Sequence, residues 1–324
     1  MFFIYKMAEI ERLLAPAFPK ALELMSVIPR DEQIIWGSIL KGEYSAIKRF
    51  KDHRTVPFQE PVANHTLRML ELCHSTKLLD LVPAEFQPML IQTILIHDGS
   101  ETILEDQSAE SRMDQAKGDQ NKIEKIDKEK AERERRVIRI FLDKYFNPPT
   151  AEYYEYLYHG YYLAENVARD ALRFIIRPAD YNNGLSAYNQ GRSFTHIPIE
   201  IPLLVKMLDR IATTQVVIDH GVNLNQYPDY VEFSQKYVSG PVLAVELLNV
   251  RRERQHHEGP GLFSKGVASP GRHYLLAPIK MHGLTSSRPL RSGLPVPEWF
   301  KTATNNLQQL VFSQQGQLKE KTCL

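Results

Sequence analysis

Cysteine is scarce in this sequence: among its 324 residues only two are cysteines, Cys73 and Cys323. Secreted domains that depend on disulfides carry several paired cysteines, so this usage argues against that class and favours a reducing, cytoplasmic compartment. An excess of one charge sign is also lacking, since 40 Lys and Arg face 39 Asp and Glu. No overall field therefore draws the protein toward nucleic acid or an anionic membrane, and any such binding must be local.

Long apolar runs are absent as well. No stretch approaches the roughly 18 consecutive apolar residues of a membrane-spanning helix, and the opening MFFIYKMAEIERL becomes charged too early for a signal peptide. We therefore expect a soluble protein with no membrane partner. Its length is sufficient for a core that needs neither disulfides nor a structural metal.

Apolar residues recur three and four positions apart along much of the chain, which is the periodicity of amphipathic helices. Asp31 is a candidate N-cap, and Pro83 is placed to open a helix. The pattern thus predicts an all-α fold. The predicted helices lie within residues 10–51, 64–74, 84–97, 137–145, 151–176, 201–217, 227–250 and 297–312.

Two segments depart from this periodicity. Residues 106–136 contain nine acidic and nine basic side chains, a composition typical of a solvated helix or a mobile insertion. Residues 251–291 contain eight Lys or Arg against two Glu, together with many Pro and Gly, and predict an irregular segment. We therefore expect a helical domain over residues 1–250, with its core at about 30–220, and a C-terminal extension over 251–324 with a short final helix.

The aromatic stretch YYEYLYHGYY at 153–162 allows two interpretations. A row of tyrosines could stack on nucleic-acid bases. On a helix, however, about half of these side chains must face the interior. We favour the core role.

Histidine and aspartate interrupt three of the apolar helices. His65 lies in EPVANHT, His97 and Asp98 follow the apolar run ILI, and Asp209 lies within PLLVKMLDRIATT. Polar groups without partners are costly in a core, so their convergence would favour a shared cation. Two imidazoles and two carboxylates suit a divalent transition ion such as Mn, Co, Fe, Ni or Zn better than Ca, and Mg is a further candidate cation. Asp180, in IRPADYNNG, is the alternative to Asp209 as the last ligand.

This H…HD…D pattern resembles the signature of the HD-domain metal-dependent phosphohydrolases and is most similar to their 5′-deoxynucleotidase branch. The similarity includes EPVANHT, KMLDRIA and an HD pair that is followed by Glu101 and Asp106, and it covers roughly residues 30–220. Asn64 stands where the branch has an acid before its first histidine. The resemblance implies an HD-domain helical bundle, a divalent metal cation, a nucleotide substrate and a homodimer.

Three further residues receive roles from the same resemblance. Glu101 lies three positions after Asp98, so a continuing helical turn would place both on one face. Glu101 or Asp106 would orient a water molecule or protonate the leaving 5′-oxygen, and Arg54 would bind the substrate phosphate. Since a metal-bound water ionises near pH 7, we expect attack of hydroxide on the phosphate of a (deoxy)nucleoside 5′-monophosphate.

A second class of function needs no catalysis. The same helical scaffold could bind a nucleotide or nucleic acid, with the basic 251–291 segment supplying phosphate contacts. We favour the enzyme, because a scaffold would have little use for both Glu101 and Asp106. Outside this set, His220 is expected to cap the helix that contains Asp209, and the histidines of the extension have no accompanying ligand pattern.

Overall fold

Helices dominate the computed structural model, which describes residues 18–51, 58–104, 114–117, 119–176, 200–220 and 298–322. This confirms the predicted all-α class. The elements are α2 (Pro19–Leu24), the 3₁₀ turn η1 (Met25–Val27), α3 (Arg30–Lys41), α4 (Glu43–Ala46), β1 (Lys48–Arg49), β2 (Glu60–Pro61), α5 (Val62–Ser75), α6 (Leu78–Leu81), η2 (Ala84–Phe86), α7 (Gln87–Ile96), α8 (Glu101–Leu104), α10 (Gln120–Tyr145), α11 (Pro148–Ile176), α13 (Glu200–Asp219) and α16 (Glu298–Thr322).

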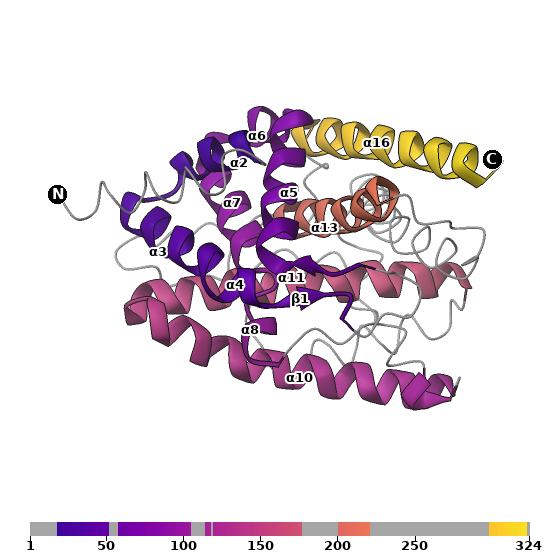
Figure 1. Ribbon diagram of the computed structural model, residues 1–324, viewed down its shortest axis with the longest axis horizontal. Coiled ribbons are helices and arrows are strands. Elements are labelled where there is room, and N and C mark those ends of the chain that lie inside the picture. Colours follow the sequence, from indigo (N-terminus) through magenta and orange to yellow (C-terminus); the bar gives the residue numbers. More distant parts are fainter. Residues whose placement is uncertain are drawn as a thin grey trace, which may run out of the picture.

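Four long helices, α10, α11, α13 and α16, follow one another across the molecule, each packed against the next (Figure 1). The shorter α5 and α7 pack against α13, and α7 also packs against α11. Their apolar faces merge into one hydrophobic cluster that extends from α2 to α16. None of the helices in the described part of the chain combines the length and hydrophobicity that crossing a bilayer requires.

The start of α3 differs from the sequence-based expectation. The helix begins at Arg30 with Pro29 as its N-cap, so the prediction that Asp31 is the N-cap is wrong. The carbonyl of Pro29 already accepts a hydrogen bond from the Gln33 amide at 3.0 Å, which starts the helical pattern two residues earlier. Asp31 lies instead in the first turn, where a carboxylate is favoured by the positive end of the helix dipole.

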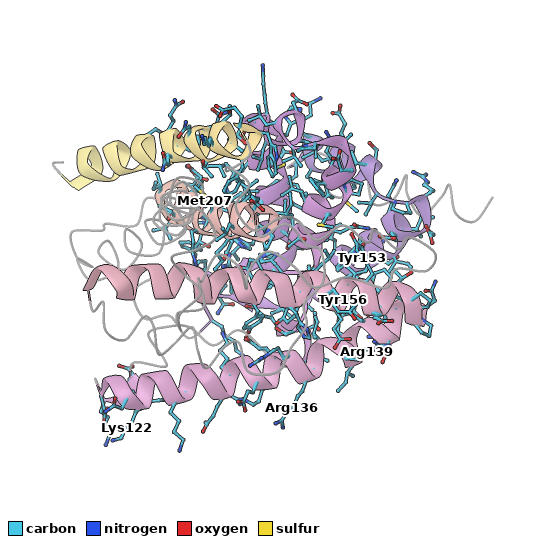
Figure 2. All side chains as sticks on the ribbon, turned by 180° about the vertical axis from the view of Figure 1, so that it is seen from behind. Lys122, Arg136, Arg139, Tyr153, Tyr156 and Met207 are labelled. Atoms are coloured by element: carbon cyan, nitrogen blue, oxygen red, sulfur yellow. The ribbon has the colours of Figure 1, made fainter. Side chains whose placement is uncertain are left out.

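The charged segment forms part of a longer helix than expected. Residues 120–136 and 137–145, predicted to differ in character, belong to the single helix α10, which Asp119 caps by accepting bonds from the Asn121 and Lys122 amides. Lys122 and Arg136 are exposed and project away from the body of the protein (Figure 2). Residues 120–136 thus form a helix, as one of the two interpretations of this segment predicted, and most of its described charged side chains are at least partly exposed, although Glu134 is buried.

The tyrosines of α11 face the core, as the favoured interpretation predicted. Tyr154, Tyr158 and Tyr161 are at most 4% exposed. Tyr153 and Tyr156 are partly buried and pack against the same core. Residues 153–162 therefore do not present a row of exposed tyrosine rings on which bases could stack.

The final helix is longer than expected and joins the same core. Instead of ending near residue 312, α16 continues to Thr322. Phe300, Ala303 and Leu307 are buried in the cluster that α13 also lines. The predicted helix at 227–250 and the basic segment 251–291 lie outside the described residues.

Candidate metal centre

The helix α7 carries its C-terminal end into the core rather than toward water. Every side chain from Leu90 to Ile96 is buried, and His97, the residue after the helix, is 3% exposed. Asp98 and Gly99 follow in a tight turn that leads into α8. A Cβ atom on Gly99 would lie 2.8 Å from Cδ1 of Ile138, so the side chain of Ile138 on α10 would have to shift to accept any larger residue at this position.

Three of the four predicted ligands come together at this turn. One potential ligand atom each from His65, His97 and Asp98 lies within 4.8 Å of the others. His65, on α5, is completely buried, and its ring centroid is 5.3 Å from that of His97. Two imidazoles and a carboxylate at this spacing match the ligand chemistry of divalent transition-metal ions.

The hydrogen bonding of His97 determines which of its nitrogens is available. Nδ1 lies 2.6 Å from the carbonyl oxygen of Ile94, and because a carbonyl can only accept, Nδ1 carries the proton. In the neutral ring Nε2 then holds a lone pair, and it lies 2.9 Å from Oδ2 of Asp98. Neither atom has a hydrogen-bond partner in the described part of the chain. A proton or a cation between them would remove the repulsion of two facing lone pairs.

The carboxyl group of Asp98 supplies negative charge to the cluster. Burial raises its pKa, but the positive charge of the His97 ring in its protonated form and that of the Arg49 guanidinium lower it by more, so the pKa lies below its ordinary value. Asp98 is therefore ionised at neutral pH.

His65 is neutral at physiological pH. Burial and the nearby Arg49 guanidinium lower its pKa from 6.5 to about 3, against the opposing effect of Asp209. Neither ring nitrogen has a hydrogen-bond partner among the described residues. The contact between Nε2 and Oδ1 of Asp209, at 3.2 Å, lacks hydrogen-bond geometry. A completely buried imidazole with both nitrogens unsatisfied is costly unless a ligand engages one of them.

Asp209, the fourth predicted ligand, lies beside His65 with its two oxygens in different surroundings. Oδ2 accepts hydrogen bonds from the Tyr161 hydroxyl at 2.7 Å and from the Lys206 ammonium at 3.2 Å. Oδ1 faces His65 and lies 3.9 Å from Nη2 of Arg49. Burial raises the pKa of Asp209, but the cationic groups of Arg210 and Lys206 hold it well below its ordinary value.

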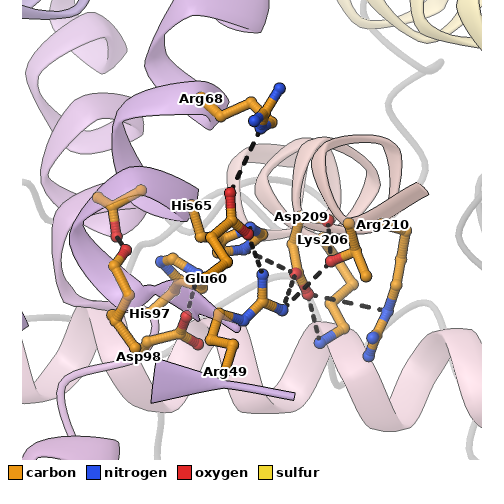
Figure 3. A network of polar contacts seen from close by, with 12 residues as sticks. Arg49, Glu60, His65, Arg68, His97, Asp98, Lys206, Asp209 and Arg210 are labelled. Carbon is orange, nitrogen blue, oxygen red and sulfur yellow. Dashed lines mark hydrogen bonds and ion pairs between the residues drawn. The ribbon is translucent and has the colours of Figure 1, made fainter. Parts of the chain in front are cut away.

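Sequence analysis missed Arg49 and Glu60, which the structure places beside His65. The two residues oppose each other across the β1–β2 pair, with Nη1 of Arg49 at 3.7 Å from Oε2 of Glu60 (Figure 3). The same carboxylate lies 4.0 Å from Nδ1 of His65. Burial raises the pKa of Glu60, and the guanidinium groups of Arg49 and Arg68 oppose that effect. Glu60 thus places a second carboxylate near His65 in addition to Asp209, whereas Asn64 is exposed.

The remaining predicted residues have different outcomes. Glu101 begins α8 and is partly buried, and its amide donates a hydrogen bond to the Asp98 carbonyl at 3.0 Å. This bond is one of several between residues three apart after α7, so the turn that joins Asp98 to Glu101 has 3₁₀ rather than α-helical hydrogen bonds and still places residues three apart on one side. Asp106, Arg54 and Asp180 lie outside the described residues.

The capping role predicted for His220 is confirmed. Its Nδ1 donates to the carbonyl oxygen of Val216 at 2.8 Å at the end of α13. The ring also stacks on Phe58, with centroids 3.8 Å apart. His220 is therefore accounted for by the local structure of the helix end.

Comparisons with known proteins do not assign the chain to a family. No model of a known protein family matches the chain, and neither the curated proteins nor the solved structures give a match to it. The resemblance to HD-domain phosphohydrolases therefore depends on the sequence pattern alone.

Proposed function

We propose that the protein is a divalent-cation-dependent phosphohydrolase whose substrate is a nucleotide, specifically a (deoxy)nucleoside 5′-monophosphate. The observation that carries the proposal is the convergence of His65, His97 and Asp98, with ligand atoms within 4.8 Å of one another in the core. Buried ionisable groups in such an arrangement are typical of functional sites rather than of structural cores. In addition, the order of these residues along the chain resembles the signature of the HD-domain phosphohydrolases.

The residues fit a cation on grounds that do not depend on the resemblance. Both nitrogens of His65, Nε2 of His97 and Oδ2 of Asp98 are buried atoms without hydrogen-bond partners in the described part of the chain. Each can act as a ligand atom when its lone pair is free. A bound divalent cation would engage one nitrogen of His65 together with Nε2 of His97 and Oδ2 of Asp98. When bound, it would promote ionisation of water and neutralise charge on phosphoryl oxygens.

The protein's own groups would provide the remaining requirements of phosphate hydrolysis. Glu101 is tied to the Asp98 turn by its backbone, where its carboxylate could hold a water molecule or move a proton. Arg49, whose pKa is raised by Asp98, Asp209 and Glu60 against the effect of burial, carries a permanent positive charge. In this proposal Arg49 is a phosphate-binding cation next to the cluster, the role that sequence analysis gave to Arg54.

The test is phosphate release by the purified protein from a panel of nucleoside mono-, di-, tri- and cyclic phosphates with Mn²⁺ or Co²⁺. We expect activity that Asp98→Asn abolishes and that the matched control His74→Gln leaves intact, because His74 is exposed at the far end of α5. Inactivity of wild-type protein with bound cation on every nucleotide would refute the enzyme. Nucleotide binding without phosphate release would instead support the scaffold alternative.

A further inference from the structure

The side chain of Tyr161 touches both sides of the candidate metal centre. Its ring packs edge to face against His97, with centroids 5.6 Å apart and the planes at 74°. Its hydroxyl donates to Oδ2 of Asp209 at 2.7 Å. His97 follows α7 and Asp209 belongs to α13, so one side chain from α11 contacts residues on two other helices.

Lys206 completes this arrangement from one turn before Asp209 on α13. Its ammonium donates to the Tyr161 hydroxyl at 2.8 Å and to Oδ2 of Asp209 at 3.2 Å. The same group lies 4.4 Å from the centroid of the Tyr161 ring. All three residues are 4% exposed, so water competes little for these hydrogen bonds.

These hydrogen bonds give the two carboxylate oxygens of Asp209 different partners. Oδ2 is engaged by Tyr161 and Lys206, whereas Oδ1 lies 3.2 Å from Nε2 of His65. Without the two donors the carboxylate could rotate and place either oxygen toward His65. Outer hydrogen-bond partners of this kind orient ligands in metal sites, and their loss typically costs about 10- to 100-fold in metal affinity.

We propose that Tyr161 is a positioning residue, acting with Lys206, which holds Asp209 with Oδ1 toward the cluster and keeps the His97 ring in place. The inference rests on the proposed function only in requiring that the cluster binds a cation. It concerns affinity for that cation and not the reaction. Sequence analysis treated Tyr161 only as a core residue, and its burial gave no reason to distinguish it from its neighbours on α11.

The experiment measures the Kd for Co²⁺ by titration of the full-length protein, together with its unfolding in the absence of cation. Tyr161→Phe removes only the hydroxyl and keeps the ring against His97. We expect Co²⁺ binding about 10-fold weaker or more. The matched control is Tyr154→Phe, which removes an equally buried hydroxyl of the same helix that hydrogen-bonds Glu32 instead, and it should leave the Kd within about twofold.

A double-mutant cycle separates positioning from general damage to the structure. In an Asp209→Asn background Tyr161→Phe should change the Kd by less than about twofold, because the residue through which Tyr161 acts is already altered. Lys206→Met tests the positioning role independently, through the direction in which it changes the Kd. Removing a positive charge should by itself strengthen cation binding, so weaker binding by this variant supports positioning and stronger binding contradicts it.

The outcomes distinguish this inference from the proposed function. If wild-type protein binds Co²⁺ and Asp98→Asn does not, but Tyr161→Phe binds as tightly as wild type, the positioning role is refuted and the metal centre stands. An equal loss in Tyr154→Phe, or an undiminished effect in the Asp209→Asn background, refutes it as well. If wild-type protein binds no Co²⁺, both the proposed function and this inference fail.

Discussion

Nε2 of His97 lies 2.9 Å from Oδ2 of Asp98, and neither atom has a hydrogen-bond partner in the described part of the chain. The two residues are adjacent in sequence, and the bond from Nδ1 of His97 to the Ile94 carbonyl directs Nε2 toward the carboxylate. Two facing lone pairs in a core favour any positive charge placed between them. This relationship underlies the first prediction.

Cation binding should stabilise the fold. A cation that binds only the folded protein contributes about 2.7 kcal/mol when its concentration is 100 times its Kd. We expect the unfolding temperature to rise with Mn²⁺, Co²⁺ or Zn²⁺ and to fall again with EDTA, as measured by differential scanning calorimetry. His65→Gln and Asp98→Asn should remove the response, while the exposed His74→Gln should keep it. A full response in Asp98→Asn would contradict the assigned ligands.

Buried His65 should make cation-free protein sensitive to mild acid. Its pKa falls from 6.5 to about 3 on folding, so between these values the unfolded chain takes up a proton that the folded protein excludes. Stability is complete above pH 6.5 and decreases as the pH falls, by about 2 kcal/mol between pH 6.5 and 5. Urea unfolding in EDTA at pH 7 and pH 5 measures the change. The same decrease in His65→Gln would show that His65 is not its source.

Gly99→Ala should destabilise the protein by about 1–3 kcal/mol, since its Cβ would overpack the contact with α10. The new atom would lie 2.8 Å from Cδ1 of Ile138 and 2.9 Å from Cδ1 of Ile96. Adding Ile138→Val removes the first of these atoms and should restore part of the loss. Chemical unfolding of the two single variants and the double variant measures the coupling. Strictly additive effects would contradict the proposed contact.

A second buried polar network, which shares no residue with the cluster, should affect stability alone. Tyr154 donates to Oε2 of Glu32 at 2.5 Å and accepts from Nε1 of Trp36 at 2.7 Å, while Gln92 donates to the same carboxylate. Tyr154→Phe leaves these buried groups with fewer partners and should cost about 1–3 kcal/mol. Denaturant unfolding measures the cost. An accompanying loss of Co²⁺ affinity would show that the network and the cluster are linked.

Much of the fold could be predicted because helical periodicity is a local property. The apolar spacing located the helices that carry His65 and Asp209, and their burial followed from the same pattern. Element ends were less accurate. The start of α3 depended on Pro29, and the continuity of α10 depended on charged residues that form helix as readily as loop.

The sequence by itself determined that His65 and Asp209 lie on buried apolar helices and that His97 and Asp98 end another apolar run, because spacing along the chain sets the face of each helix. Only the tertiary structure decided that Arg49 and Glu60 lie beside His65 and that Tyr161 holds Asp209, 48 residues away in sequence. Partners across such separations depend on how helices pack against one another. That packing arises from the shapes of many side chains together, which no short stretch of sequence encodes.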